Sequence, residues 1–206
     1  MTDASPWARS LVRSLVACGL RHACICPGSR STPLVLALHQ HPDIHTPVLH
    51  DERTAAFLAL GLARATRRPT AVVCTSGSAA AHLLPAITEA AADDLPLLLL
   101  TADRPPELHH CGAPQVMDQQ RLFGTHVRAF HDPGPPWTPP AHSRTPSPDP
   151  LDHIADTARR AFRDALGTPH HRPGPVHLNL PFREPLSPPE PLPGPPQGPT
   201  RTSAHP

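Results

Sequence analysis

Four short polar stretches, each directly after an apolar run, hold the side chains of this sequence that could do chemistry. They are residues 28–31 (Gly-Ser-Arg-Ser), 51–53 (Asp-Glu-Arg), 75–78 (Thr-Ser-Gly-Ser) and 103–107 (Asp-Arg-Pro-Pro-Glu). Carboxylates in such places can exchange protons, and the planar fork of arginine pairs with a carboxylate through two hydrogen bonds. If the fold brings the stretches together, they could form one site.

Glu52 is the central residue of the second stretch. An apolar strand is expected at residues 44–49 and an alanine-rich helix at residues 55–65, so Glu52 falls between a strand's carboxyl end and a helix's first turn. Open α/β sheets place their ligand chemistry there. An acid in the first turn also complements the helix macrodipole, and the sequence leaves both interpretations open.

Strands and helices are expected to alternate along the chain. The strands look buried on both faces, which is typical of a parallel sheet. The sequence therefore predicts an α/β fold with an open, mostly parallel six-stranded sheet covered by helices on both faces. All four polar stretches would then lie on the same edge. Strands are expected at residues 22–26, 44–49, 70–74, 96–100, 127–130 and 176–180, and helices at 6–20, 34–41, 55–65, 83–92 and 151–166.

The 32 prolines limit the part of the 206-residue chain that can fold. They crowd into residues 133–150 and into the end of the chain. We expect one domain at residues 1–187, with a proline-rich loop at 133–150, and a disordered tail at 188–206.

Composition excludes several classes of function. The net charge of +1, the absence of lysine and the few aromatic residues argue against a nucleic-acid partner. No apolar run approaches the ~20 residues of a membrane span, and the amino terminus lacks a secretory layout, so a cytoplasmic protein is expected. Five cysteines without a CxxC pair and sixteen histidines without an HExxH pattern predict no metal site. Phosphate-binding GxGxxG and GxxxxGK[ST] loops are also missing.

Five motifs occur in this order along the chain: CPGSRSTPL (26–34), DER (51–53), VVCTSGSA (72–79), LTADRPPE (100–107) and CGAPQ (111–115). Together they resemble the amino-terminal, pyrimidine-binding domain of the MenD family. These thiamine diphosphate-dependent transferases act in menaquinone biosynthesis as 2-succinyl-5-enolpyruvyl-6-hydroxy-3-cyclohexene-1-carboxylate synthases, joining 2-oxoglutarate to isochorismate with loss of CO2. The resemblance covers about residues 7–186, and VHLNLPFREPL at 176–186 is similar to the domain's end.

The resemblance implies a role for each candidate residue. Glu52 would be the catalytic glutamate that hydrogen-bonds N1′ of the cofactor's aminopyrimidine. The other matched positions would line the cofactor or face the carboxylates of isochorismate. On the cofactor side they are Thr75, Ser76, Gly77 and Gln115, and on the substrate side Ser29, Arg30, Arg104 and, again, Gln115.

Local alternatives exist for the substrate-side residues. Arg30 could pair with Asp51 or another nearby acid, Arg104 with Asp103 or Glu107, and the serine at 29 could merely cap a helix.

The chain also departs from the MenD pattern. Pro114 stands where a side-chain amide is expected, which removes a hydrogen-bonding group from the substrate pocket. The GDG…N signature, which in the family holds Mg2+ (or Mn2+) and the diphosphate, is missing from this sequence. The chain is therefore expected to be inactive alone and to need a homodimer, another homo-oligomer or a complementary diphosphate-binding chain. The alternatives are a non-catalytic interaction module derived from such an enzyme and an unrelated small-molecule-binding α/β domain.

Overall fold

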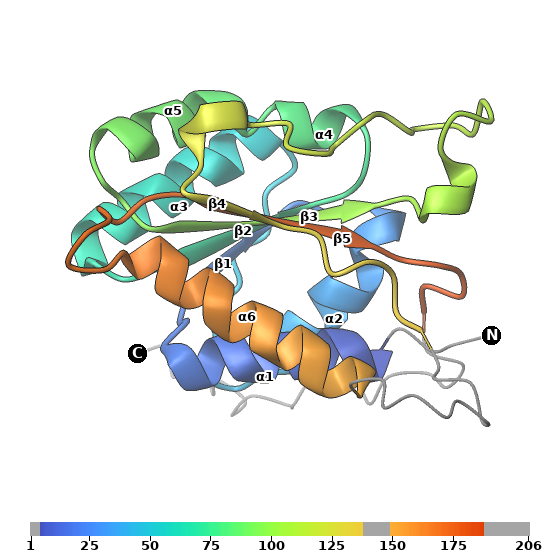
Figure 1. Cartoon of the computed structure of the whole chain (residues 1–206), viewed down its shortest axis with the longest axis horizontal. Helices are drawn as coiled ribbons and strands as arrows, with labels where there is room; N and C mark the ends of the chain where they lie inside the picture. Colours follow the sequence, from blue (N-terminus) through green and yellow to red (C-terminus); the bar gives the residue numbers. More distant parts are fainter. Residues whose placement is uncertain (1–4, 138–148, 188–206) are drawn as a thin grey trace, which may run out of the picture.

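A parallel sheet forms the middle layer of the chain, between two layers of helices (Figure 1). The computed structural model describes residues 5–137 and 149–187. In these residues the sheet has five strands in the order β1-β2-β3-β5-β4, and every neighbouring pair is parallel. The predicted α/β fold with a parallel sheet is confirmed. The strands are β1 (Ala23–Ile25), β2 (Thr70–Cys74), β3 (Leu97–Asp103), β4 (Ala129–His131) and β5 (Val176–Pro181).

The prediction of six strands was wrong by one, at residues 44–49. This segment runs parallel to β1 and forms only isolated bridges within the described residues. The backbone N–H groups of His45 and Leu49 still donate hydrogen bonds to carbonyl oxygens in and just before β1, both at 2.9 Å. Pro47 accepts a hydrogen bond from Ile25 at 2.9 Å but has no N–H to donate in return. A continuous ladder is therefore interrupted, and the segment becomes an irregular edge.

Helices cover both faces of the sheet, as predicted. In Figure 1, α1, α2 and α6 lie on one side of the strands and α3, α4 and α5 on the other. Both layers bury apolar side chains against the sheet, in two separate core clusters. The helices are α1 (Ser5–Cys18), α2 (Thr32–His39), α3 (Glu52–Thr66), α4 (Ser78–Ala81), α5 (Leu84–Ala92) and α6 (Pro150–Leu166).

Strand β3 shows why the strands read as continuous apolar runs. All seven of its residues are buried. Leu98 and Leu100 belong to the core cluster under α1 and α6, whereas Leu97 and Leu99 belong to the cluster under α3 and α5. Successive side chains of a strand point to opposite faces, and here both faces are covered.

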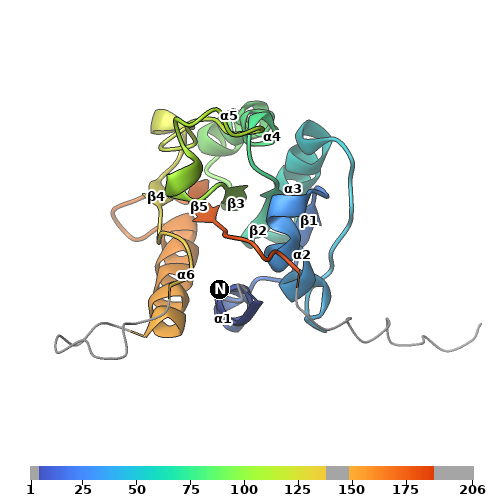
Figure 2. The same ribbon diagram turned by 90° about the vertical axis from the view of Figure 1, so that its right-hand side faces the viewer.

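The chain turns to opposite sides of β1, and this fixes where a ligand site would lie. After α2 it returns along residues 44–49 on one side of β1, and after α3 it returns as β2 on the other. Helices α2 and α3 lie on opposite faces of the sheet. Open α/β folds bind ligands outside the carboxyl ends of strands at such a reversal. Figure 2 looks onto that edge of the sheet.

Part of the predicted domain layout lies outside the described residues. The proline-rich loop at 133–150 is described only at its two ends, and the tail at 188–206 is not described. The boundary between the domain and the tail at residue 187 stays a prediction.

Candidate functional site

The four predicted polar stretches lie at the carboxyl edge of the sheet (Figure 2). Residues 28–31 follow β1 and contain the 3-10 turn Ser29–Ser31. Residues 51–53 begin α3, residues 75–78 follow β2, and residues 103–107 follow from the end of β3. Because the strands are parallel, their carboxyl ends meet at one edge, and the stretches are brought into one region.

Glu52 is half-buried at the start of α3, and its neighbour caps the helix. The Asp51 side chain accepts a hydrogen bond from the Thr54 backbone N–H at 2.7 Å. Burial raises the pKa of the Cys26 thiol to about 12, and the nearby Glu52 charge is the next cause. Within the described residues, Glu52 makes no side-chain hydrogen bond or ion pair. Its carboxylate is therefore available to a ligand next to the end of β1.

Gly28 allows the loops after β1 and β2 to touch. A Cβ atom at this position would lie 2.4 Å from Cβ of Thr75, which is buried, so any larger residue would overlap with it. The absence of a side chain at Gly28 therefore lets the two loops pack directly against each other.

Ser76 is hydrogen-bonded to two of the other predicted residues. Its hydroxyl accepts a hydrogen bond from the Arg104 guanidinium and donates to the Gln115 carbonyl oxygen at 3.4 Å. Gln115 Nε2 donates in turn to the Ser76 carbonyl oxygen at 3.0 Å. Gly77 has a φ of +84°, and a Cβ there would lie 3.0 Å from Gln115 Cγ. Small residues after β2 thus let the segment that carries Gln115 lie against this loop.

Arg30 is buried at the opposite side of the same edge. Its Nη1 donates to the Phe182 carbonyl oxygen at 2.8 Å, and its Nη2 lies 3.5 Å from Glu184 Oε1. Its Nε is buried and has no hydrogen-bond partner among residues 5–137 and 149–187. Burial lowers the pKa of the guanidinium, the Arg104 charge lowers it further, and Glu184 opposes this. The guanidinium thus keeps N–H donors that no described residue uses.

The local alternatives for the substrate-side residues are mostly not realised. Arg30 pairs with a distant acid, as described above. Glu107 pairs with Arg183, with N–O distances of 2.6 and 3.0 Å, and not with Arg104. Ser29 is exposed and does not cap α2, whose N-cap residue is Ser31. The Ser31 side chain also makes no capping bond and donates instead to a loop carbonyl.

A buried polar network behind the loop after β2 was missed by the sequence reasoning. Gln119 Oε1 accepts a hydrogen bond from the Gly77 backbone N–H at 2.8 Å. Its Nε2 donates to Asn179 Oδ1 at 2.9 Å and to the Ala102 carbonyl oxygen at 3.2 Å. Asn179 Nδ2 donates to Asp103 Oδ2 at 2.9 Å. One amide side chain thus joins the loop to β3 and β5.

The network continues along β5 to His177, which is fully buried. His177 Nε2 lies 2.8 Å from Thr101 Oγ1, and Thr101 also donates to Asn179 at 3.2 Å. Burial lowers the pKa of His177 from 6.5 to about 3, so the ring is neutral in the folded chain. Two polar residues in the otherwise apolar strand at residues 176–180 were the available signal for this network.

His177→Leu is expected to change how stability depends on pH. Between about pH 6 and pH 4 the unfolded chain binds a proton at His177 and the folded chain does not, so this residue makes stability fall as pH falls. The variant loses that component and keeps an acceptor for Thr101 on Asn179. The difference in free energy of unfolding between the two proteins should change by up to about 1.4 kcal/mol per pH unit in this window. Urea unfolding at pH 7, 5 and 4 measures it, and parallel pH profiles would contradict it.

Comparison with known protein families identifies the domain. The sequence model of the family "Thiamine pyrophosphate enzyme, N-terminal TPP binding domain" matches residues 7–122, more than half of the chain. The chain belongs to this family. The matched region contains β1 to β3 and all four polar stretches of the carboxyl edge.

Longer proteins are similar to this thiamine pyrophosphate enzyme domain over about nine tenths of the chain. Proteins named 2-succinyl-5-enolpyruvyl-6-hydroxy-3-cyclohexene-1-carboxylate synthase are 51% identical in Haloquadratum walsbyi and 52% in Roseiflexus castenholzii, each over 188 residues. One from Chloroflexus aurantiacus is 49% identical over 184 residues. The alignments cover 91%, 91% and 88% of this chain, but only 28%, 31% and 29% of the relatives. The chain thus spans about three tenths of their length. The predicted resemblance to the MenD family is confirmed over about nine tenths of this chain.

Two further properties concern the residues 5–137 and 149–187. No helix there combines the length and apolar character that a membrane span requires. Their histidine, cysteine, aspartate and glutamate side chains form no group of three suited to a metal ion.

Proposed function

We propose that this chain is the pyrimidine-binding part of a 2-succinyl-5-enolpyruvyl-6-hydroxy-3-cyclohexene-1-carboxylate synthase. The reaction would join 2-oxoglutarate to isochorismate with loss of CO2. The observation that carries the proposal is the Glu52 carboxylate, which is half-buried at the topological switch, caps no helix and pairs with no cation among the described residues. The similarity to the synthases supports the choice of substrates.

The residues at the carboxyl edge fit the aminopyrimidine end of thiamine diphosphate. A free carboxylate suits a ring nitrogen, and the small residues at 28 and 75–78 let the loops after β1 and β2 pack closely at the same edge. Glu52 would hold a proton at N1′, while Ser76, Gly77 and Gln115 would border the ring. When bound, the cofactor supplies the electron sink that decarboxylation of a 2-oxo acid requires.

The arginines of the same edge would bind the isochorismate carboxylates. Arg30 has a buried Nε without a partner, and Arg104 is fixed through Ser76 with only part of its donors used. Two carboxylates would satisfy these donors and reduce the repulsion between the guanidinium groups that lowers the Arg30 pKa. Ser29, which is exposed beside Arg30, would add a hydroxyl contact.

The diphosphate and its Mg2+ or Mn2+ would be held by a second polypeptide region, supplied by a complementary chain or a second subunit. Exposed apolar residues near Glu52 support this. Val48 is 62% exposed and Phe57, on α3 itself, is 41% exposed. A protein surface covering α3 would bury both and complete the site.

The test is a complementation experiment. The purified chain is titrated with thiamine diphosphate and Mg2+ in a calorimeter, alone and mixed with the remaining regions of the Roseiflexus castenholzii synthase expressed separately. We expect cofactor binding and consumption of isochorismate with 2-oxoglutarate only in the mixture. Absence of both in the mixture, while the intact relative binds and turns over, would contradict the proposal and leave a non-catalytic interaction module.

A further inference from the structure

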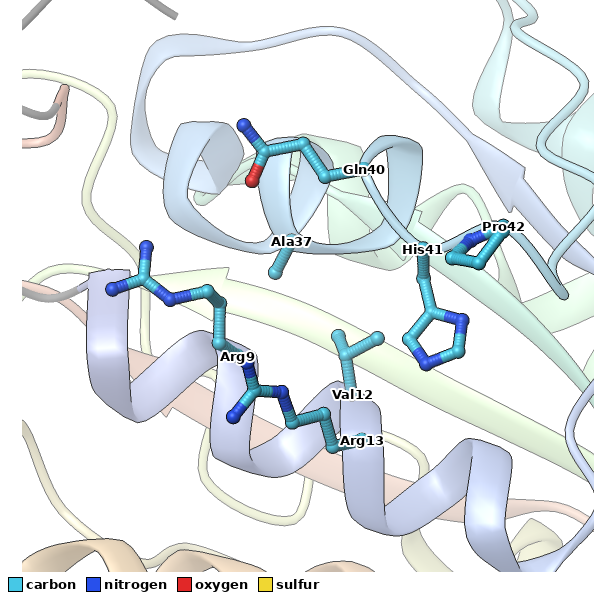
Figure 3. Close-up of a pocket in the computed structure, with 7 residues that line it drawn as sticks. All are labelled: Arg9, Val12, Arg13, Ala37, Gln40, His41 and Pro42. Carbon is cyan, nitrogen blue, oxygen red and sulfur yellow. The ribbon is translucent and has the colours of Figure 1, made fainter.

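A pocket of about 300 Å3 lies between α1 and the end of α2, apart from the candidate site (Figure 3). It shares no residue with the carboxyl-edge site. Helix α2 separates the two, because its first residue follows the 28–31 stretch, whereas Ala37 near its end and residues 40–42 just after it line the pocket. Eight helical residues span about 12 Å. The volume is at the lower end of the range for small-molecule sites. The lining residues are Arg9, Val12, Arg13, Ala37, Gln40, His41 and Pro42.

Four of the seven lining side chains carry hydrogen-bond donors, and none of the lining residues that the structure describes is an acid. Arg9 and Arg13 come from α1, and Figure 3 shows the Arg13 guanidinium reaching back along the helix towards Arg9. Gln40 lies across the pocket on the α2 side, and its side-chain amide makes no hydrogen bond within the part of the chain described. Donors from α1 and from the segment that follows α2 thus border the pocket from two sides, and such donors suit an anion.

His41 adds a donor of defined direction. Its Nδ1 accepts a hydrogen bond from the Asp43 backbone N–H at 3.3 Å. In the neutral ring the proton is then on Nε2, so that atom can donate to a ligand. The last carbonyl groups of α2 offer little to a cation, because Leu36 and Leu38 accept hydrogen bonds from the backbone of residues 40 and 41.

Helix stability does not explain the two arginines. They are four residues apart on α1, where like charges repel. Neither forms an ion pair with another described residue, and α1 has no basic residue in its last turn, where a cation would stabilise it. The whole chain has a net charge of only +1, so this unpaired positive charge is a local feature.

We propose that this pocket binds a small organic anion. Its carboxylate or phosphate group would meet the guanidinium groups of Arg9 and Arg13 at one end of the pocket, and its apolar body would rest on Val12 and Ala37. The Nε2–H of His41, at the other end, would be open to a second polar atom of the ligand. Both of these floor residues are almost fully buried by the protein, which leaves a shallow apolar base under the charged rim.

The test is an NMR titration of the 15N-labelled chain at constant ionic strength. The probes are inorganic phosphate, benzoate and the neutral benzyl alcohol, and the readout is the amide shifts of Val12, Ala37 and His41. We expect saturable shifts with at least one of the two anions and none with benzyl alcohol. The responding anion identifies the preferred group. In the double variant R9A/R13A the apparent affinity should fall about tenfold or more.

The matched control is R159A/R163A on α6. This pair also stands four residues apart and is exposed, but Arg159 is already paired with Asp156. It should bind like the unaltered chain. If R9A/R13A fails to fold by its amide spectrum, R9Q/R13Q replaces it. Lack of saturation with both anions, equal binding of benzyl alcohol, or the same loss in the control would each overturn the proposal.

Discussion

Replacing Glu52 by glutamine is expected to abolish turnover in the complemented enzyme, with a loss of at least about 100-fold. Glutamine keeps the size of the side chain and removes the group that holds a proton at the cofactor's ring nitrogen. Stability should hardly change, because Glu52 makes no hydrogen bond or ion pair among the described residues. The measurement is isochorismate consumption by the mixture of chains, together with urea unfolding of the variant alone.

Asp51→Asn provides the matched control. It removes one negative charge from the adjacent position at the same helix end, and asparagine caps a helix about as well as aspartate. The hydrogen bond from the Thr54 backbone N–H can therefore persist. We expect the control to retain most of the activity. Unchanged turnover in Glu52→Gln, or equal losses in both variants, would contradict the role assigned to Glu52.

The sequence predicted the elements well where the signal is local. Strand β2 has the predicted bounds of residues 70–74, because a run of β-branched and small apolar residues ends at a polar turn. Helix α6 begins one residue before its predicted start and ends where predicted, since the glycine at 167 stops a clear apolar stripe. Residues 44–49 were misjudged because apolar character alone does not show the effect of a missing N–H at Pro47.

The site was less predictable because its contacts are distant in the sequence. Arg30 pairs with Glu184, 154 residues away, and not with the nearby Asp51. Gln119 reaches Asn179 over 60 residues. Periodicity marks which residues face a core, but it does not say which polar residues meet inside that core. The motifs therefore marked residues that lie at the carboxyl edge of the sheet. The buried hydrogen-bond network behind them could be recognised only in the structure.

Replacing Gln119 by leucine is expected to lower the free energy of unfolding by roughly 2–4 kcal/mol. Leucine fills a similar volume but leaves the Gly77 N–H and the Ala102 carbonyl oxygen without the partner they have now, and both are buried. Asn179 loses one of its two donors and keeps Thr101. Because the Gly77 N–H donates its hydrogen bond to this side chain, hydrogen exchange at its amide should also accelerate. Urea unfolding and residue-resolved hydrogen exchange measure the two effects.

The adjacent Gln120 is the matched control, since it is exposed and its side-chain amide donates a hydrogen bond to Asp132, which is also exposed. Gln120→Leu should change stability by less than about 0.5 kcal/mol and leave exchange at Gly77 as it was. A loss of stability in Gln119→Leu without faster exchange at Gly77 would mean that the network stabilises β3 and β5 but does not hold the loop. Faster exchange at Gly77 alone, with little change in stability, would place the role of Gln119 in positioning the candidate cofactor loop. Equal behaviour of the two variants would contradict the network as described, because only one of the two glutamines is connected to it.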